Sequence, residues 1–427
     1  MGATCVVGLQ WGDEAKGKIV DILTEKHDIV VRYQGGANAG HTVVFDGKKY
    51  KLSLIPSGIF RPNVQCVVAG GVVLNPQNFI QEMDGLIAQG IDCQNLLIST
   101  RAHIIMPWHF EEDRLMNRTT SGENIGTTMR GIGPCYRDKV GRSWAIRLGD
   151  LYREEFPQRV KMICETKNRL LFGMDPEGGE NRLDAEKITA DYLLYADRLR
   201  PMATDTTAYL LDALDSGKKI LCEGAQGALL DIDHGTFPYV TSSNSSGVGV
   251  CSGAGLPAKS IEKLVGIIKA YTTRVGGGPF PTEQDNEIGQ LIRDEGNEYG
   301  TVTRRPRRCG WFDAVAARYT ARLSGATCLS VMLLDVLSKL PEIQICTEYE
   351  LNGERTSHFP AHVDDLRLVK PHYITLPGWL EDITKAQSWD DLPTNAQNYV
   401  RKIGEIIGVP VEIVSVGPDR KQTIFVK

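Results

Sequence analysis

A glycine-rich stretch near the N-terminus, residues 8–21, combines phosphate-binding signals with acidic side chains. Its pattern Gly-x4-Gly-Lys, ending at Lys18, matches the first part of a phosphate-binding loop, but Ile19 stands where Ser or Thr usually ligates magnesium. Asp13 and Glu14 would repel phosphate unless one of them has another role. A carboxylate beside a nucleotide can bind the metal or act as a base. The stretch therefore predicts a nucleotide site, with an ordinary glycine turn as the alternative.

A second polar, glycine-rich stretch follows at residues 34–42. Its glycines let the backbone approach a ligand, while Asn38, His41 and Thr42 supply hydrogen-bonding groups. A short apolar run precedes each stretch, so both are expected to leave the ends of buried strands. Apolar residues at helical spacing follow the first stretch, which completes a strand, a turn and a helix. That order is the usual setting of a phosphate cradle.

Together, the two stretches resemble the adenylosuccinate synthetase family, GTP-dependent enzymes that join aspartate to inosine monophosphate (IMP). The resemblance continues through further motifs spread along nearly the whole chain, at residues 125–134, 223–227, 231–244, 273–276, 278–283, 307–311 and 415–420. It implies a ligase of purine biosynthesis that makes adenylosuccinate, GDP and phosphate through a 6-phosphoryl-IMP intermediate. This reaction is the first committed step from IMP to AMP.

The resemblance also implies roles for individual side chains. Asp13 would remove the N1 proton of IMP, His41 would be the acid that stabilises the transferring phosphoryl group, and Gln226 would join them in catalysis. Asp13 and the carbonyl of Gly40 would bind one Mg²⁺ per subunit, the role left vacant at Ile19, with GTP as co-substrate. Since a free aspartate has a pKa of about 3.9, geometry must contribute much of the base catalysis.

The family pattern implies three overlapping sets of ligand residues. GTP would contact both glycine-rich stretches and a base pocket, namely Gly12, Asp13, Glu14, Ala15, Lys16, Gly17, Lys18, Gly40, His41, Thr42, Arg307, Leu333, Leu334, Asp335, Ser415, Val416 and Gly417. IMP would contact Asp13, Glu14, Ala15, Lys16, Asn38, Ala39, Gly40, His41, Thr128, Arg142, Gln226, Thr241 and Arg305. Aspartate would bind a single loop made of Thr301, Val302, Thr303, Arg304, Arg305, Pro306 and Arg307.

Several of these residues have simpler interpretations beside the functional one. Residues 301–308 are rich in arginine, which suits two carboxylates and a phosphate, but a solvated basic loop would look the same. Asp335 would accept the N1 and N2 protons of guanine, or cap a turn after a strand. Arg142 would cross the interface of a homodimer to reach the nucleotide phosphate of the other subunit, or remain solvated. Lys16 and Lys18 would add positive charge for the GTP phosphates.

The sequence departs from the family pattern at a few positions. Ala15 stands where glycine is usual, and it is acceptable there only if the backbone does not need positive φ. Ala37 occupies a position often held by a polar residue, and Val302 and Arg304 replace Thr and Gly in the aspartate loop. Leu333 replaces a usual Lys beside the guanine-binding aspartate. Every residue with a proposed chemical role is retained, so the enzymatic interpretation stands.

Apolar runs alternating with helical periodicity predict an α/β fold, a large and mostly parallel central sheet wrapped by helices. The expected strands are residues 4–7, 29–33, 67–69, 96–99, 219–222, 265–272, 327–334, 411–416 and 422–426. The expected helices are residues 77–89, 160–171, 190–199, 311–323 and 394–407. We expect a single domain, residues 1–427, with a helical insertion at about 151–217.

Three local expectations concern the surroundings of the site. Residues 43–50 should form a hairpin turned at Asp46 and Gly47. The polar segment 113–125 should be a mobile loop over the site. Because side chains alternate along a strand, Leu333 and Asp335 should face the same side.

Composition limits the classes of function. The chain of 427 residues is 42% hydrophobic and 24% charged, as in ordinary soluble proteins. A net charge of −5 argues against general attraction to nucleic acid or membranes. The ten cysteines are scattered without a CxxC pair, which indicates reduced thiols. With no signal-peptide pattern and no apolar run of spanning length, we expect a cytoplasmic protein without nucleic-acid or membrane partners.

Two alternatives remain beside the synthetase. A GTP-binding switch protein would explain the phosphate loop and Asp335, but not the aspartate loop, Gln226 or Thr241. A related ligase could act on another purine, such as a 2-aminopurine nucleotide. A switch would hydrolyse GTP slowly without IMP or aspartate, whereas comparing inosine with guanosine monophosphate would separate the two ligases.

Overall fold

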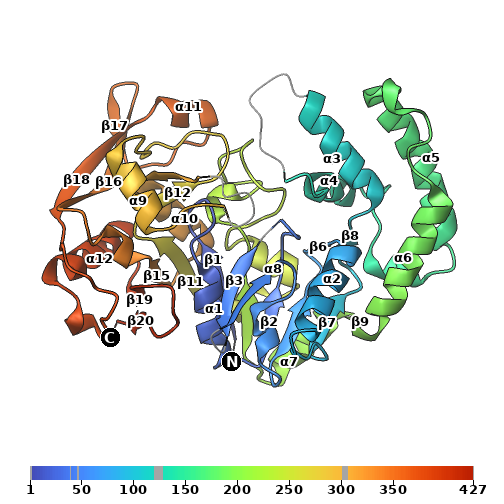
Figure 1. Cartoon of the computed structure of the whole chain (residues 1–427), viewed down its shortest axis with the longest axis horizontal. Coiled ribbons are helices and arrows are strands. Elements are labelled where there is room, and N and C mark those ends of the chain that lie inside the picture. Colours follow the sequence, from blue (N-terminus) through green and yellow to red (C-terminus); the bar gives the residue numbers. More distant parts are fainter. Residues whose placement is uncertain (1, 39, 46–47, 120–127, 301–305, 427) are drawn as a thin grey trace.

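A ten-stranded sheet forms the centre of the computed structural model, which describes residues 2–38, 40–45, 48–119, 128–300 and 306–426 (Figure 1). Of residues 41–45, 48, 49, 118 and 119 only the backbone is described. In spatial order the strands are β20 (Thr423–Phe425), β19 (Val411–Ser415), β15 (Cys328–Met332), β11 (Ile261–Lys269), β1 (Ala3–Gly8), β10 (Ile220–Glu223), β2 (Ile29–Arg32), β5 (Gln65–Val68), β7 (Leu96–Ser99) and β9 (Ala203–Thr204).

The sheet is parallel except at one edge, where β19 and β20 run antiparallel. Every residue of β2, β10 and β15 is buried, as a parallel sheet covered by helices on both faces requires. In the middle, Cys5 of β1 lies opposite Cys222 of β10 and Leu264 of β11. The predicted large, mostly parallel sheet wrapped by helices is confirmed.

Several expected elements are present with shifted ends. The helices α2 (Pro76–Ile87) and α12 (Thr394–Ile407) are confirmed. The helix expected at 311–323 begins later, as α10 (Ala314–Ser324), because the Asp313 side chain caps it by accepting from the amide of Ala316 at 3.1 Å. The strand expected at 265–272 is β11, followed by a separate strand β12 (Thr272–Arg274), which pairs with β13 (Arg308–Gly310).

The hairpin is confirmed as β3 (His41–Phe45) paired antiparallel with β4 (Lys48–Leu52), with Phe45 opposite Lys48. Its turn residues lie outside the described residues. The loop prediction for residues 113–125 is wrong for residues 113–119, which form the second half of α3 (Pro107–Thr119). Residues 120–125 lie outside the described part of the chain.

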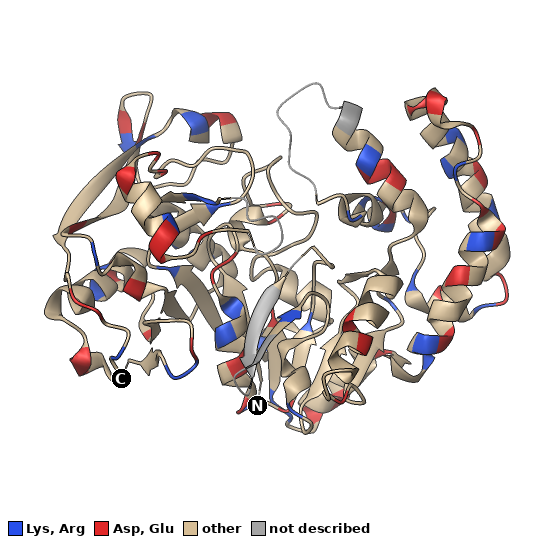
Figure 2. Ribbon diagram, viewed as in Figure 1, with Lys and Arg blue, Asp and Glu red and all other residues tan. Residues whose placement is uncertain are grey.

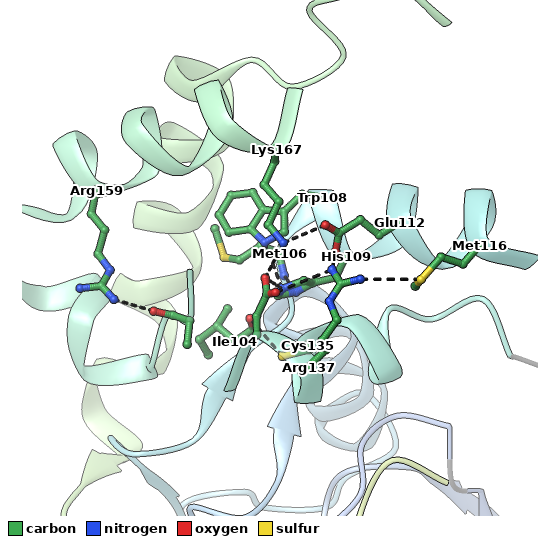
Figure 3. A network of polar contacts seen from close by, with 12 residues as sticks. Ile104, Met106, Trp108, His109, Glu112, Met116, Cys135, Arg137, Arg159 and Lys167 are labelled. Atoms are coloured by element: carbon green, nitrogen blue, oxygen red, sulfur yellow. Dashed lines mark hydrogen bonds and ion pairs between the residues drawn. The ribbon is translucent and has the colours of Figure 1, made fainter. Parts of the chain in front are cut away.

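A buried polar network explains why α3 continues through a polar segment. Lys167 of α5 (Phe156–Met174) donates to Glu112 Oε1 of α3 at 2.8 Å and to Asp138 Oδ2 of α4 (Ile132–Gly141) at 2.7 Å (Figure 3). The side chains of Lys167 and Glu112 are 0% exposed. The inner face of α3 therefore includes charged residues that are paired across three helices.

The helices α5 and α6 (Ala185–Leu199) lie at the right-hand side of the molecule in Figure 1. Val160 and Ile163 of α5 belong to the same hydrophobic cluster as Ile188 and Tyr192 of α6. Lys, Arg, Asp and Glu mark both helices along their length (Figure 2). Within the expected insertion, β9 joins the edge of the central sheet, and α7 (Thr206–Asp215) packs into the cluster that contains β1.

A smaller sheet lies toward the opposite end of the molecule. It consists of β14 (Phe312–Asp313), β16 (Glu342–Leu351), β17 (Glu354–Thr356) and β18 (Lys370–Pro377). All ten cysteines have free thiols, as predicted, and only Cys251 is more than slightly accessible. Among the described residues, no helix is both long and apolar enough to cross a membrane.

Candidate active site

The segments singled out from the sequence meet at the carboxyl ends of the parallel strands. β1 leads into the first glycine-rich stretch and β2 into the second, while β10, β15 and β19 lead to Gln226, Asp335 and Ser415. The ends of neighbouring parallel strands open on one edge of the sheet, where ligands of α/β proteins bind. Motifs separated by up to about 400 residues in sequence are thus brought to one edge.

Glu14 holds the first glycine-rich stretch in shape. Its side chain is fully buried, and Oε1 accepts from the amides of Gln10 at 3.1 Å and Gly12 at 2.9 Å. Its Oε2 accepts from Lys16 Nζ at 2.6 Å. A Cβ on Gly8 would lie 2.3 Å from the same oxygen, which explains glycine there. Glu14 therefore closes the loop and neutralises Lys16, which leaves Asp13 as the exposed carboxylate of the stretch.

The helix α1 (Lys16–Thr24) starts in a conformation that suits an anion. No side chain among the described residues caps its N-terminus. Uncapped amides at a helix N-terminus, with the helix dipole behind them, attract phosphate. The condition stated for Ala15 is not met, because this residue has φ 62° and ψ 32°. The backbone here does need the left-handed conformation, and alanine occupies it with strain.

Asp13 forms an ion pair with Arg307, the last residue of the implied aspartate loop. Its Oδ2 lies 2.9 Å from Nε of Arg307, and the two side chains are 39% and 16% exposed. Burial opposes the charge on Arg307, but Asp13 and Glu298 outweigh this effect and raise the pKa of its guanidinium. The proposed base and the proposed aspartate loop are therefore adjacent in space.

The side chains of Gln226 and Thr241 include buried polar atoms at the candidate site. Gln226 Nε2 donates to Asn38 Oδ1 at 3.3 Å, which links the end of β10 to the second glycine-rich stretch. Gln226 Oε1, Thr241 Oγ1 and Asp335 Oδ1 are buried and have no hydrogen-bond partner within the described part of the chain. Buried polar atoms are nearly always satisfied, so such atoms indicate a place for a ligand or water.

The expected base pocket contains a lysine that sequence reasoning assigned to the phosphates. Lys18 Nζ donates to Ser415 Oγ at 2.7 Å and to the carbonyl of Gly417 at 2.8 Å. Burial lowers the pKa of Lys18 to about 8, although Asp335 acts in the opposite direction. Burial likewise raises the pKa of Asp335. Lys18 thus connects α1 to the segment after β19.

The prediction that Leu333 and Asp335 alternate along one strand is wrong. β15 ends at Met332, Leu333 takes a left-handed conformation with φ 57°, and a 3-10 helix follows at Leu334–Leu337. The apolar run continues past the end of the strand because Leu334, Val336 and Leu337 are also buried in the core. The relative direction of Leu333 and Asp335 is therefore set by a turn. Leu333 is partly buried and packs against the core.

Left-handed backbone is concentrated at the proposed site. Nine described residues other than glycine have positive φ, and five of them belong to the implied ligand sets, namely Asp13, Ala15, Arg142, Gln226 and Leu333. A sixth, Met129, is next to Thr128. Such conformations are uncommon outside glycine and tend to gather where function requires a particular geometry.

Arg142 and Thr128 lie on either side of α4, and both are exposed. Arg130, close to Thr128, donates to the carbonyl of Ala37, which joins this region to the second glycine-rich stretch. Pro306 is exposed as well. The side chains of His41 and Thr42, residue Ala39, and the aspartate-loop residues Thr301, Val302, Thr303, Arg304 and Arg305 lie outside the described residues.

The donor set is consistent with a magnesium ion that arrives with a nucleotide. The described residues include no group of three or more His, Cys, Asp or Glu side chains that could hold a metal. Mg²⁺ is commonly bound by one or two carboxylates together with substrate phosphates and water. Asp13 offers one accessible carboxylate, and Gly40 is exposed beside the hairpin.

Sequence reasoning missed two buried cations next to the site. Arg274 lies 4.9 Å from the ring centroid of Trp11 and donates to Thr236 Oγ1 at 3.1 Å, and burial lowers its pKa to about 9. Lys269 donates to Glu298 Oε1 at 2.6 Å. A lysine inside the apolar run 265–272 was the available signal, because buried lysines require a paired acid.

Comparison with known proteins identifies the family of this chain. The adenylosuccinate synthetase family model matches residues 5–424. The enzymes named adenylosuccinate synthetase from Ligilactobacillus salivarius and Heliobacterium modesticaldum are each 51% identical, over 99% of this chain and 98% and 99% of theirs. The fully ligated adenylosuccinate synthetase of Plasmodium falciparum has a TM-score of 0.93 and 38% identity, over 100% of both chains.

A more distant structure shares the fold. The cyanophage S-2L succinoaminodeoxyadenylate synthetase, bound to dGMP and dATP, has a TM-score of 0.61 at 19% identity, over 99% of this chain and 95% of that chain. At this identity the likeness concerns the fold alone. From the family match and the relatives at about half identity, this chain belongs to the adenylosuccinate synthetase family, enzymes of the ligase class.

Proposed function

We propose that the protein ligates L-aspartate to IMP at the expense of GTP, giving adenylosuccinate, GDP and phosphate. The observation that carries this proposal is the contact between Asp13 and Arg307. It joins the phosphate loop after β1 to the base of the arginine-rich segment implied to bind aspartate. A switch protein has no use for such a segment beside its phosphate loop.

The chemistry follows from the purine. In the first step Asp13 takes the N1 proton, and the O6 atom attacks the γ-phosphorus of GTP while the bond to GDP breaks. In the second step the amine of aspartate attacks C6 and gives up one proton to the departing phosphate, which leaves with the electron pair of the C6–O bond. His41 is the proposed acid for the phosphoryl oxygens. Gln226, whose Oε1 has no hydrogen-bond partner among the described residues, would orient the purine.

The remaining roles are assigned to the parts already described. GTP would place its phosphates at the N-terminus of α1 and its guanine at Asp335, Ser415 and Gly417. Asp13 and the Gly40 carbonyl would hold Mg²⁺. When bound, the ion would reduce the negative charge of the phosphates. Thr128 and Thr241 would contact IMP.

We further propose a cytoplasmic homodimer in which the exposed Arg142 reaches the IMP phosphate of the neighbouring site. The chain is taken as one domain with a helical insertion.

Ultraviolet monitoring of purine conversion tests the proposal. The purified protein should convert IMP with GTP, aspartate and Mg²⁺, and should need all three substrates. Conversion of guanosine monophosphate in place of IMP would support the related 2-aminopurine ligase instead. Slow GTP hydrolysis that is indifferent to IMP and aspartate would support a switch protein.

A further inference from the structure

We propose that Glu298 is a positioning residue whose carboxylate directs the guanidinium of Arg307 toward Asp13. The proposal rests on the proposed function, in which Arg307 belongs to the aspartate-binding loop. Glu298 is in none of the ligand sets implied by the family resemblance. It lies three residues before Thr301, where that loop begins, and both its carbonyl and its carboxylate accept from Arg307.

The guanidinium of Arg307 spans from a buried anion to an accessible one. Its Nη1 donates to Glu298 Oε2 at 2.6 Å, while its Nε lies 2.9 Å from Asp13 Oδ2. The Glu298 side chain is 2% exposed, against 39% for Asp13. Because the guanidinium is a rigid plane, holding one edge on Glu298 determines where the other edge points.

Buried partners keep Glu298 ionised and in place. Its Oε1 accepts from Lys269 Nζ and from the Tyr271 hydroxyl, each at 2.6 Å. Burial acts to raise the pKa of Glu298, but the charges of Lys269 and Arg307 prevail and lower it. Lys269 is in turn fixed by donating to Thr273 Oγ1 at 2.7 Å. The carboxylate is therefore a fixed, charged acceptor, the strongest kind for an arginine.

The backbone around Glu298 and Arg307 is also held by contacts that do not involve the Glu298 carboxylate. The amide of Arg307 donates to the carbonyl of Glu298 at 2.9 Å, and Tyr299 and Pro306 form an isolated β-bridge. Arg293 Nε donates to the carbonyl of Arg307 at 2.8 Å. These three contacts remain when the carboxylate is removed. We therefore expect its removal to change mainly the orientation of the Arg307 side chain.

Glu298→Gln is the direct test. We expect kcat/KM for aspartate to fall about tenfold to a hundredfold, the loss typical of a hydrogen bond between charged groups. The KM for IMP should change little. The double variant Lys269→Met/Glu298→Gln leaves no unpaired buried lysine, so it should fold even if the single variant does not, and should show the same loss.

A double-mutant cycle separates positioning from a structural role. If Glu298 acts through Arg307, Glu298→Gln should cause no further loss of kcat/KM in an Arg307→Gln background. Full additivity of the two losses would overturn the proposal, as would an unchanged kcat/KM for aspartate in Glu298→Gln.

A second cycle does not depend on turnover. Glu298→Gln and Asp13→Asn should be non-additive in the free energy of unfolding, because Arg307 is bound to both carboxylates. Additive changes in the free energy of unfolding would count against the positioning of Arg307 by Glu298, even in a protein without ligase activity. Absence of activity in the unmodified protein, with this coupling present, would refute the proposed function and leave the positioning role standing.

Glu112→Gln is the matched control. Glu112 is bonded through Oε1 to Lys167 at 2.8 Å and through Oε2 to Arg137 at 2.6 Å, so it loses the same kinds of bond. We expect lower thermal stability with unchanged kcat/KM for aspartate. An equal loss of kcat/KM in both variants would show that any buried glutamate has this effect and would overturn the specific role of Glu298.

Discussion

Glu298 and Glu112 bind the same kinds of side chain, but the arginines that they bind lead to different places. Each is buried, and each accepts from a lysine on Oε1 and an arginine on Oε2, at distances between 2.6 and 2.8 Å. Arg137, the arginine bound to Glu112, is 46% exposed and extends toward Met116 (Figure 3). Arg307, the arginine bound to Glu298, ends on Asp13 at the edge of the sheet.

The difference between the two networks lies in what the arginine reaches. Around Glu112 the polar atoms join α3, α4 and α5. His109 Nε2 lies 3.1 Å from Asp138 Oδ2, the oxygen that also accepts from Lys167. That network therefore holds the three helices together. Around Glu298 the network presents one cation at a strand end where several motifs meet. Equivalent buried chemistry thus serves packing in one region and the site in the other.

The largest expected effect breaks the network at the site. Asp13→Asn removes both the proposed base and the outer partner of Arg307, because an amide cannot take the N1 proton. Turnover should fall by roughly 10²–10⁴-fold, the usual value of general-base catalysis, while GTP binding is largely kept. Steady-state rates and nucleotide titration of the purified variant measure the two quantities. Turnover near that of the unmodified protein would remove Asp13 from the mechanism.

Breaking the helical network should affect stability in place of chemistry. Lys167→Met leaves Glu112 and Asp138 buried without their shared cation. Loss of one partner from a buried ion pair typically costs about 3–5 kcal/mol, so the free energy of unfolding should fall by that order. Denaturant unfolding measures this, and kcat/KM for aspartate at low temperature should remain that of the unmodified protein. A selective change in kcat/KM would contradict the division between the two networks.

The base pocket provides a test of intermediate size at the site. Asp335→Asn replaces an acceptor of two guanine protons by an amide, so kcat/KM for GTP should fall at least about tenfold and use of xanthosine triphosphate should improve. Asp382→Asn is the control, since Asp382 is a nearby carboxylate that influences the pKa of Asp335. Equal use of ATP and GTP by the unmodified protein would refute the role of Asp335.

Local patterns were enough to predict most of the fold. β1, β2 and β10 are short apolar runs, and α12 has its apolar residues at helical spacing, so each element follows from neighbours in sequence. The end of α3 could not be predicted in this way. Its inward carboxylate at Glu112 is satisfied by Lys167, 55 residues away, so the sequence shows only a polar segment.

For the candidate site, the sequence proposes members but not their geometry. The turn at Leu333 escaped prediction because a buried apolar turn and a buried strand have the same apolar pattern. The bond between Lys18 and Ser415, at the end of β19, joins residues 397 positions apart. Glu298 had no recognisable motif around it. Contacts of this kind depend on the sheet order, which brings distant strand ends together.

A pH series sharpens the comparison by adding a third lysine, Lys18, which lies in the site. Its pKa is lowered from 10.5 to about 8, so its cation is lost as the pH rises through this value. We expect the KM for GTP to rise above about pH 8. Between the two pKa values the unfolded chain binds more protons at this group than the folded protein, so stability contributed by Lys18 should increase with pH.

Lys18→Met provides the comparison for both trends. This variant should have no inflection in the KM for GTP near pH 8, and thermal unfolding should show the unmodified protein gaining stability relative to it as the pH rises from 8 to 10.5. Parallel curves for the two proteins would contradict the lowered pKa. The Lys167 network should contribute equally to both, which isolates the effect of the site.

The smallest expected effect concerns strain, which the site has and the helical network lacks. Ala15 has φ 62°. In this left-handed conformation a Cβ atom clashes with the backbone, whereas glycine adopts it without strain. Ala15→Gly should raise the free energy of unfolding by up to about 1 kcal/mol, because relief of the left-handed conformation outweighs the greater freedom of glycine in the unfolded chain. Ala37→Gly is the control at the other alanine departure, since Ala37 is buried and is not among the residues with positive φ. It should destabilise, by losing a packed methyl group and gaining unfolded-chain entropy. Chemical denaturation of the two variants measures the difference. The same sign of change in both would show that the conformation of Ala15 is not strained, and that the site and the helical network do not differ in this respect.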